Sequence, residues 1–352
     1  MPELRQLTGA RGLAAWAVVL YHLRRSIDGL PAPFTTALGK GYLAVDFFFL
    51  LSGFVIWLAW RDRLPGQALR FWRKRFARIW PLHAATLLFA AALALALQAR
   101  GRPDPAFPWT ELPLHLLLVQ EWGTTAGLRW NDPAWSISAE AGAYLLFPLL
   151  VRAVDWRRWP TPALLAAAAA VLAVLPLVMG PGGLGADIVR FGLLRCLCEF
   201  AAGTIVAALY LRGGGVRAPL ALGLALLTAA LLGAPEALAV PPAFAALLLA
   251  LARSRSSLLA ADPIHRLGEI SYATYLSHFL LWKAVKLLLP AGPVPPAAIA
   301  GYLLLVLLAS HALYRYLELP AQRWLNARPL PWRNERGRGA LPGHGRQDRV
   351  VR

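Results

Sequence analysis

An arginine and a histidine stand out in the first apolar segment of the sequence, Arg11 and His22. Eleven positions separate them, so on an α-helix they lie within about 20° of one face and about 16 Å apart along the axis. An arginine can hold a phosphate or a carboxylate, and a neutral histidine can accept the proton of a hydroxyl group. The pair could therefore bind an anion and act as a general base. In the structural alternative, Arg11 reaches the lipid headgroups and His22 bonds a neighbouring helix.

Further ionisable residues lie in segments that are otherwise suited to hydrocarbon. Asp46 interrupts a run of apolar residues, and Glu140 lies at the outer end of another. An ionised side chain at the centre of a membrane helix costs about 2.5–3.5 kcal/mol on insertion scales, so such a residue indicates function by default. We expect an arginine or a histidine beside Asp46. Arg195 and Glu199 are four apart, and on one helix they can simply neutralise each other.

The composition and the apolar runs indicate a membrane protein. The 352 residues are 58% apolar and 15% charged, with a mean hydropathy of +0.52, whereas a soluble protein carries about 25% charged residues. A helix needs about 20 apolar residues to cross a bilayer, and we expect the shorter run 112–119 to be re-entrant or interfacial. The sequence predicts an all-α, polytopic protein with about ten transmembrane helices, at 9–27, 41–60, 80–98, 135–153, 162–180, 188–211, 218–234, 236–252, 271–290 and 296–317.

The distribution of basic residues predicts the topology, because cytoplasmic loops collect lysine and arginine. With both termini in the cytoplasm, the loop from Arg61 to Arg78 lies inside and holds seven basic residues. The topology explains the net charge of +18, so we expect the lipid bilayer and no nucleic acid as a partner. We expect a transmembrane domain at 1–325 and a disordered, basic cytoplasmic tail at 326–352.

The two cysteines, Cys196 and Cys198, do not indicate a disulfide or a metal site. Residues two apart on a helix point about 200° away from each other. We therefore expect buried thiols and no metal ion.

Six short motifs follow one another along the chain. They are Arg11 and His22 with ten residues between them, Val45-Asp-Phe-Phe-Phe-Leu-Leu-Ser-Gly-Phe54, Arg73-Lys-Arg-Phe-Ala-Arg-Ile-Trp-Pro81, Trp135-Ser-Ile-Ser-Ala-Glu140, Ser271-Tyr-Ala-Thr-Tyr-Leu-Ser-His278 and Tyr316-Leu-Glu-Leu-Pro320. In this order and topology they resemble the acyltransferase-3 family of bacterial integral-membrane O-acyltransferases. The resemblance extends from about Leu4 to Arg323, nearly the whole chain.

The resemblance implies a ten-helix enzyme of the bacterial inner membrane that binds no cofactor. It would take an acyl group, commonly acetyl, from an acyl-coenzyme A co-substrate on the cytoplasmic side. The acceptor would be a hydroxyl group of a glycan, a lipid-linked saccharide or a secondary metabolite. The catalytic candidates are His22 first, with Arg11 as its motif partner, and then Asp46 and Glu140. The candidates for substrate binding are Trp135, Ser136, Ser138 and His278.

The segment from Arg70 to Arg78 is the expected donor site, because coenzyme A carries phosphates. It supplies five positive charges in nine residues, and arginine suits phosphate recognition. We expect Arg73, Arg75 and Arg78 to bind the donor, although anchoring at the inner leaflet would place the same charges there. His22 would act as a general base or as a transient acyl carrier.

Two features depart from the family's pattern. His83 stands where a tyrosine is frequent, and Ala141 and Gly142 follow Glu140 where an acidic or bulky residue is common. Both changes could alter the acceptor pocket. Many relatives also carry an esterase-like domain after the last span, and we expect this chain to be of the stand-alone type. The competing class is a transporter or flippase with a path of intramembrane ionisable residues, but the sequence shows no paired halves.

Overall fold

The computed structural model describes residues 3–27, 29–180, 183–254, 257–289 and 293–327, and these residues form helices without any strand. Each of the ten predicted apolar runs falls on a helix, which confirms the all-α class. These helices are α1 (Arg5–Leu23), α3 (Ala44–Trp60), α4 (Ala68–Ala99), α6 (Ala134–Ala153), α7 (Thr161–Met179), α8 (Ile188–Leu211), α9 (Arg217–Leu231), α10 (Glu236–Arg253), α13 (Ser271–Lys286) and α14 (Pro296–Leu313).

Shorter helices connect or extend the long ones. They are α2 (Ala32–Gly39), α5 (Leu112–Leu116), α11 (Ser257–Ala260), α12 (Asp262–Glu269) and α15 (Leu319–Ala327), with a π-helical stretch at Tyr314–Glu318. The five-residue α5 is too short to span a bilayer, as the sequence predicts for this segment. The predicted tail lies outside the described residues apart from positions 326 and 327, which end α15.

Seven helical stretches of the described residues are long and apolar enough to cross a membrane. This confirms a multi-pass membrane protein. The predicted count of ten adds α1, α9 and α13, of which α9 has 15 residues and α13 has 16. That count and the cytoplasmic position of both termini stay predictions.

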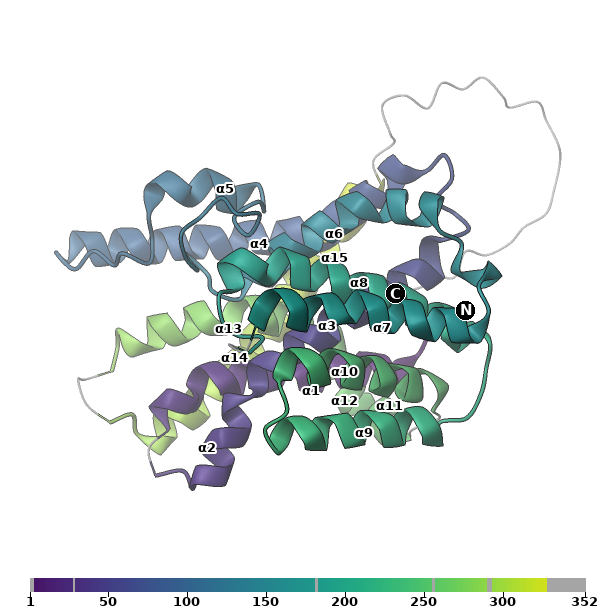
Figure 1. Cartoon of the computed structure of the whole chain (residues 1–352). Coiled ribbons are helices and arrows are strands. Elements are labelled where there is room, and N and C mark those ends of the chain that lie inside the picture. The colour runs from purple at the N-terminus through teal and green to yellow at the C-terminus, as the bar shows by residue number, and fades with distance from the viewer. Residues whose placement is uncertain (1–2, 28, 181–182, 255–256, 290–292, 328–352) are drawn as a thin grey trace, which may run out of the picture.

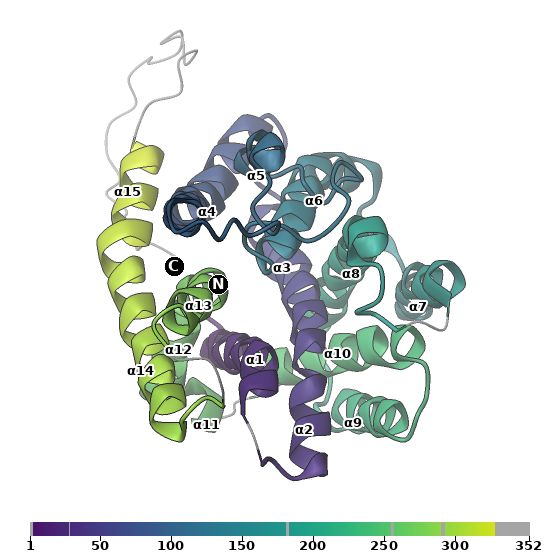
Figure 2. The ribbon, with the colours of Figure 1, turned by 90° about the vertical axis from the view of Figure 1, so that its left-hand side faces the viewer.

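The long helices lie side by side (Figure 1), and the view along most of them places α7, α9 and α14 at the edge and α3 inside (Figure 2). Helices α3 and α8 approach each other closely through two glycines. A Cβ atom on Gly53 would lie 2.0 Å from the carbonyl oxygen of Phe200, and one on Gly203 would lie 2.1 Å from that of Leu50. Small residues permit such close packing of membrane helices, so α3 and α8 form the centre of the bundle.

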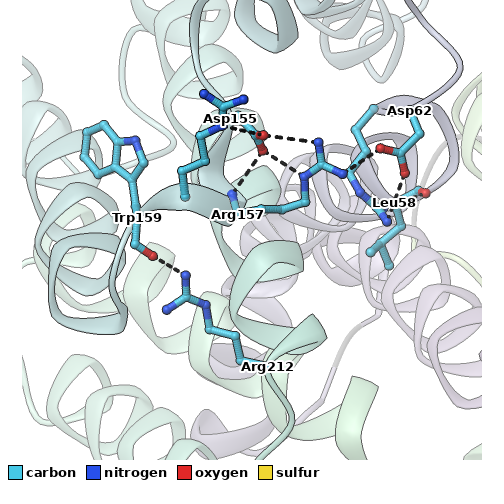
Figure 3. Close-up of polar contacts among 8 residues, drawn as sticks. Leu58, Asp62, Asp155, Arg157, Trp159 and Arg212 are labelled. Atoms are coloured by element: carbon cyan, nitrogen blue, oxygen red, sulfur yellow. Dashed lines mark hydrogen bonds and ion pairs between the residues drawn. The ribbon is translucent and has the colours of Figure 1, made fainter.

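Loops that are predicted to be cytoplasmic meet on one face of the bundle (Figure 3). Arg157 donates to Asp62 at 2.7 Å and to Asp155 at 2.8 Å, and Arg212 donates to the carbonyl oxygen of Trp159. These contacts join the end of α3, the turn before α7 and the end of α8. Exposed ion pairs of this kind contribute little to stability, but they show that the three basic loops share one face.

The basic segment Arg70–Arg78 is helical, so its predicted loop structure is wrong. Helix α4 begins at Ala68 and continues through Pro81. Arginine, lysine, alanine and leucine favour a helix, and no glycine or proline interrupts the segment before Pro81. The helix distributes the basic side chains over different faces. Arg75 and Arg78 both line one internal cavity, whereas Arg73 reaches the carbonyl oxygen of Asn326 at 3.5 Å.

Candidate active site

A cavity of about 150 Å³ lies between α1, α3, α4, α6 and α13. Three arginines line it, Arg11 from α1 and Arg75 and Arg78 from α4, together with the carboxylate of Glu140 from α6. The other polar residues of its wall are Ser52, Ser136, Tyr144, Ser271, Tyr272 and Tyr275. The cavity therefore combines positive charge with hydroxyl groups inside an apolar bundle.

The position of Arg11 depends on a close approach of α12 to α1. A Cβ atom on Gly268 would lie 1.9 Å from the carbonyl oxygen of Thr8, and one on Gly12 would lie 2.6 Å from the nitrogen of Gly268. Because both positions lack a side chain, the carbonyl of Gly268 comes within reach of Arg11, which donates to it at 2.8 Å and 3.3 Å. A neutral carbonyl holds the guanidinium in place and leaves its charge uncompensated.

The other two arginines differ in their partners. Arg78 forms an ion pair with Glu318 of the π-helical stretch. Arg75 lies over the ring of Tyr144, at 5.8 Å, and its Nε has no hydrogen-bond partner among the described residues. Within the described part of the chain, neither Arg11 nor Arg75 is within ion-pair distance of a carboxylate. Two guanidinium groups of the cavity are thus free to bind an anion.

Glu140 gives the cavity its own negative charge. Its Oε1 accepts a hydrogen bond of 2.6 Å from the hydroxyl of Tyr144, which also lies 3.3 Å from Oγ of Ser52. Among the described residues, the three arginines are accompanied by two carboxyl groups, that of Glu140 in the cavity wall and that of Glu318 paired with Arg78, so the formal charges leave one positive charge in excess. The electrostatics therefore favour an anionic ligand.

His22 lies against His278, with 3.1 Å between its Nδ1 and Nε2 of His278. The Nδ1 atom of His278 is 3.1 Å from the carbonyl oxygen of Thr274, and that of His22 is 3.0 Å from the carbonyl oxygen of Val18. A carbonyl only accepts hydrogen bonds, so both Nδ1 atoms carry hydrogen. In the described part of the chain no group bonds Nε2 of His22, and its lone pair is available to accept a proton.

Tyr275 connects the two parts of the site. Its side chain lines the cavity, and its ring centroid lies 6.2 Å from that of His278. The arginine-lined cavity and the histidine pair are therefore neighbours, because Tyr275 belongs to the wall of the one and lies beside the other.

Asp46 belongs to a different buried cluster. Arg195 donates to its two carboxylate oxygens at 2.8 Å and 2.5 Å, and Glu199 lies 3.6 Å from the same guanidinium. The expected cationic partner of Asp46 is thus confirmed as Arg195. Because this cluster ties α3 to α8 and no described hydrogen bond joins Asp46 to His22, the structure associates Asp46 with helix packing.

The predicted substrate-binding residues fall into different places. Ser136 lines the cavity, and His278 pairs with His22. The ring of Trp135 lies under Arg195, at 5.6 Å. Ser138 accepts from the backbone nitrogen of Glu121 at 3.1 Å. The structure therefore brings only Ser136 and His278 to the site, while Trp135 and Ser138 contact neighbouring segments.

Three tyrosines of the cavity wall, Tyr144, Tyr272 and Tyr275, are absent from the candidates that the sequence suggested. A signal for two of them was present. Tyr144 follows Glu140 by four positions and Tyr275 precedes His278 by three, and both spacings place side chains on the same face of a helix.

The loop between α5 and α6 contains a strained backbone and a buried carboxyl group. Leu118 and Trp130 have φ angles of 59° and 60°, which are rare for residues other than glycine. Glu121 is buried, and its Oε2 has no hydrogen-bond partner among the described residues. Burial raises the pKa of Glu121 to about 7.

Replacing Glu121 by glutamine is expected to stabilise the protein at pH 8 and to change little at pH 5. The pKa of about 7 in the folded protein exceeds the unfolded value of about 4.3, so the folded state loses stability as the pH rises between these values. Above pH 7 the loss is complete, at about 2–4 kcal/mol, and glutamine avoids it. Thermal unfolding in detergent at both pH values measures the difference. An equal shift at pH 5 and pH 8 would contradict the ionisation of Glu121 as its cause.

Together, the described residues form a multi-pass helical bundle with an internal cationic cavity and a histidine whose Nε2 makes no hydrogen bond among them, an arrangement suited to an enzyme embedded in the membrane. Comparison with known proteins gives its family. Residues 4–315 match the acyltransferase domain of the acyltransferase-3 family. The chain therefore belongs to this family and is an acyltransferase, and the transporter alternative is not supported.

Three relatives illustrate the similarity. The chain is 37% identical to Acyltransferase MdmB of Streptomyces mycarofaciens over 312 residues, which cover 79% of each chain. It is 28% identical to the putative membrane-bound transacylase BcsY of Komagataeibacter xylinus, over 94% of this chain and 86% of BcsY. It is 26% identical to the peptidoglycan O-acetyltransferase OatA of Listeria monocytogenes, over 44% of this chain and 25% of OatA. No solved structure matches the chain.

Proposed function

We propose that the protein transfers an acyl group, commonly acetyl, from an acyl-coenzyme A donor to a hydroxyl group of a cell-envelope glycan or a secondary metabolite. The reaction would take place in the bacterial inner membrane. The name of OatA, a peptidoglycan O-acetyltransferase, supports a glycan hydroxyl as the acceptor.

The observation that carries the proposed donor is the pair of uncompensated arginines, Arg11 and Arg75, in the cavity wall. Both side chains are partly buried, and removing a charge from water without giving it a partner is costly. A phosphate group offsets this cost through charge-assisted hydrogen bonds. Arg78 adds a third positive charge but already has Glu318 as its partner. Arg73 lies outside the cavity lining, so Arg11 takes its place in the donor site that we propose.

The proposed transfer step follows from the distance between Arg11, which would bind the donor's phosphates, and His22, which would act on the acceptor hydroxyl. Arg11 and His22 lie about 16 Å apart along α1, a gap that the flexible pantetheine arm of coenzyme A is suited to bridge. Nε2 of His22 accepts the proton of the acceptor hydroxyl, whose oxygen attacks the thioester carbonyl carbon. The carbon–oxygen bond forms, the carbon–sulfur bond breaks, and the leaving thiolate takes the proton from the imidazolium.

The donor site is tested by coenzyme A binding to purified protein in detergent. Arg75→Ala is expected to weaken binding by about 10- to 100-fold, because a hydrogen bond to a charged group contributes about 1.5–3 kcal/mol. Arg70→Ala is the matched control, since Arg70 belongs to the same basic segment but is exposed and bonds only the side chain of Gln67 among the described residues. Equal affinity of the Arg75 variant, the Arg70 variant and the wild type would exclude the cavity as the phosphate site.

A further inference from the structure

Tyr275 belongs to the wall of the cavity and lies beside the histidine pair. Its ring meets the ring of Phe48 edge-on, with 5.7 Å between the centroids, and both residues line the cavity. The ring centroid of His278 lies 6.2 Å from that of Tyr275. Among the described residues that line the cavity neither His22 nor His278 is present. Tyr275 is thus a wall residue of the cavity that also lies beside the histidine pair, so an acyl group that extends from the arginines toward His22 would meet its ring.

A buried hydrogen bond holds Tyr275 in this position. Its Oη lies 2.8 Å from Oγ of Ser136, and Ser136 also lies 3.1 Å from the carbonyl oxygen of Pro133. The single hydrogen of the serine hydroxyl goes to that carbonyl, so the tyrosine donates to the serine. Both side chains are buried. The bond links α13 to α6 and fixes the tyrosine side chain in the wall of the cavity.

We infer that Tyr275, oriented by Ser136, limits the length of the acyl group that reaches His22. This inference rests on the proposed acyl-coenzyme A donor and adds a selectivity for short acyl groups, such as acetyl. When a pocket has no room for an additional methylene group, the longer substrate reacts roughly 10-fold or more slowly than the shorter one. The reaction itself is unchanged, because Tyr275 acts on the space available to the acyl group.

The test measures the ratio of butyryl to acetyl transfer from the two coenzyme A thioesters in membranes that contain the full chain. The wild type is expected to prefer acetyl by at least roughly 10-fold. Tyr275→Ala, which removes the ring, is expected to raise the butyryl-to-acetyl ratio at least roughly 10-fold. Tyr275→Phe keeps the ring but loses the hydrogen bond to Ser136, so it is expected to raise the ratio less than Tyr275→Ala does. The two variants together distinguish the effect of the ring's bulk from the effect of the hydrogen bond that orients it.

A ratio that is unchanged in a folded Tyr275→Ala variant would overturn the inference. So would a wild type that transfers butyryl as fast as acetyl. If Tyr275→Ala does not fold, the butyryl-to-acetyl ratio is measured in Tyr275→Leu and Ser136→Ala instead. Both substitutions disturb the packing less, and both are expected to raise the ratio. A wild type that transfers neither acyl group overturns the proposed donor along with the inference, whereas normal acetyl transfer with an unchanged ratio overturns the inference alone.

Discussion

Replacement of His22 by alanine is expected to lower acyl transfer by about 100- to 10,000-fold, the range that a general base contributes. The reason is the arrangement of its ring. Its Nδ1 is occupied by the carbonyl of Val18 and by His278, which orients the lone pair of Nε2. Alanine removes this lone pair and changes no charged contact of the cavity.

The measurement is transfer of radiolabelled acetyl from acetyl-coenzyme A in membranes, with label counted in the envelope glycan and on the protein. His311→Ala is a suitable control, because His311 is an exposed histidine of α14. Equal labelling of glycan by the wild type and a well-expressed His22 variant would exclude His22 as the base. Label on the wild-type protein that the variant lacks would show a transient acyl carrier in place of a general base.

The helices were predictable because the length of an apolar run is a local property of the sequence. The long-range pairs were not. The spacing of Arg11 and His22 on α1 placed both on one face, yet His278 is 256 positions from His22 and no local pattern relates them. The sequence suggested His278 as a substrate-binding residue, and the structure places it against His22. The roles of His22 and His278 in the reaction stay predictions.

The basic segment shows a second limit of local reasoning. Its charges were evident, but whether Arg73, Arg75 and Arg78 act together depends on their backbone. In a loop all three could have reached one phosphate, whereas on α4 only Arg75 and Arg78 line the cavity. Arg11 joins them through the packing of α1 against α12, which two glycines permit. The proposed donor site thus depends on a close contact between two helices that is possible because Gly12 and Gly268 have no side chain.

The cluster of Asp46, Arg195 and Glu199 gives a further example, because a need for a cation near Asp46 was predictable but its source was not. Asp46 and Arg195 lie 149 positions apart. They meet because Gly53 and Gly203 bring α3 and α8 together. Each of the three side chains is almost completely buried, so every charge in the cluster depends on its neighbours.

Replacement of Arg195 by methionine is expected to destabilise the protein by about 3–5 kcal/mol, as removal of one partner does for a buried ion pair. It leaves the carboxyl groups of Asp46 and Glu199 without a cation. Asp46→Asn should be milder, because Glu199 lies 3.6 Å from the guanidinium of Arg195 and can pair with it. The double variant Asp46→Asn with Arg195→Met should recover part of the loss, since these contacting residues are not additive. Thermal unfolding in detergent gives the order of the three variants, and an Asp46→Asn variant as unstable as Arg195→Met would show that Glu199 does not share the charge of Arg195.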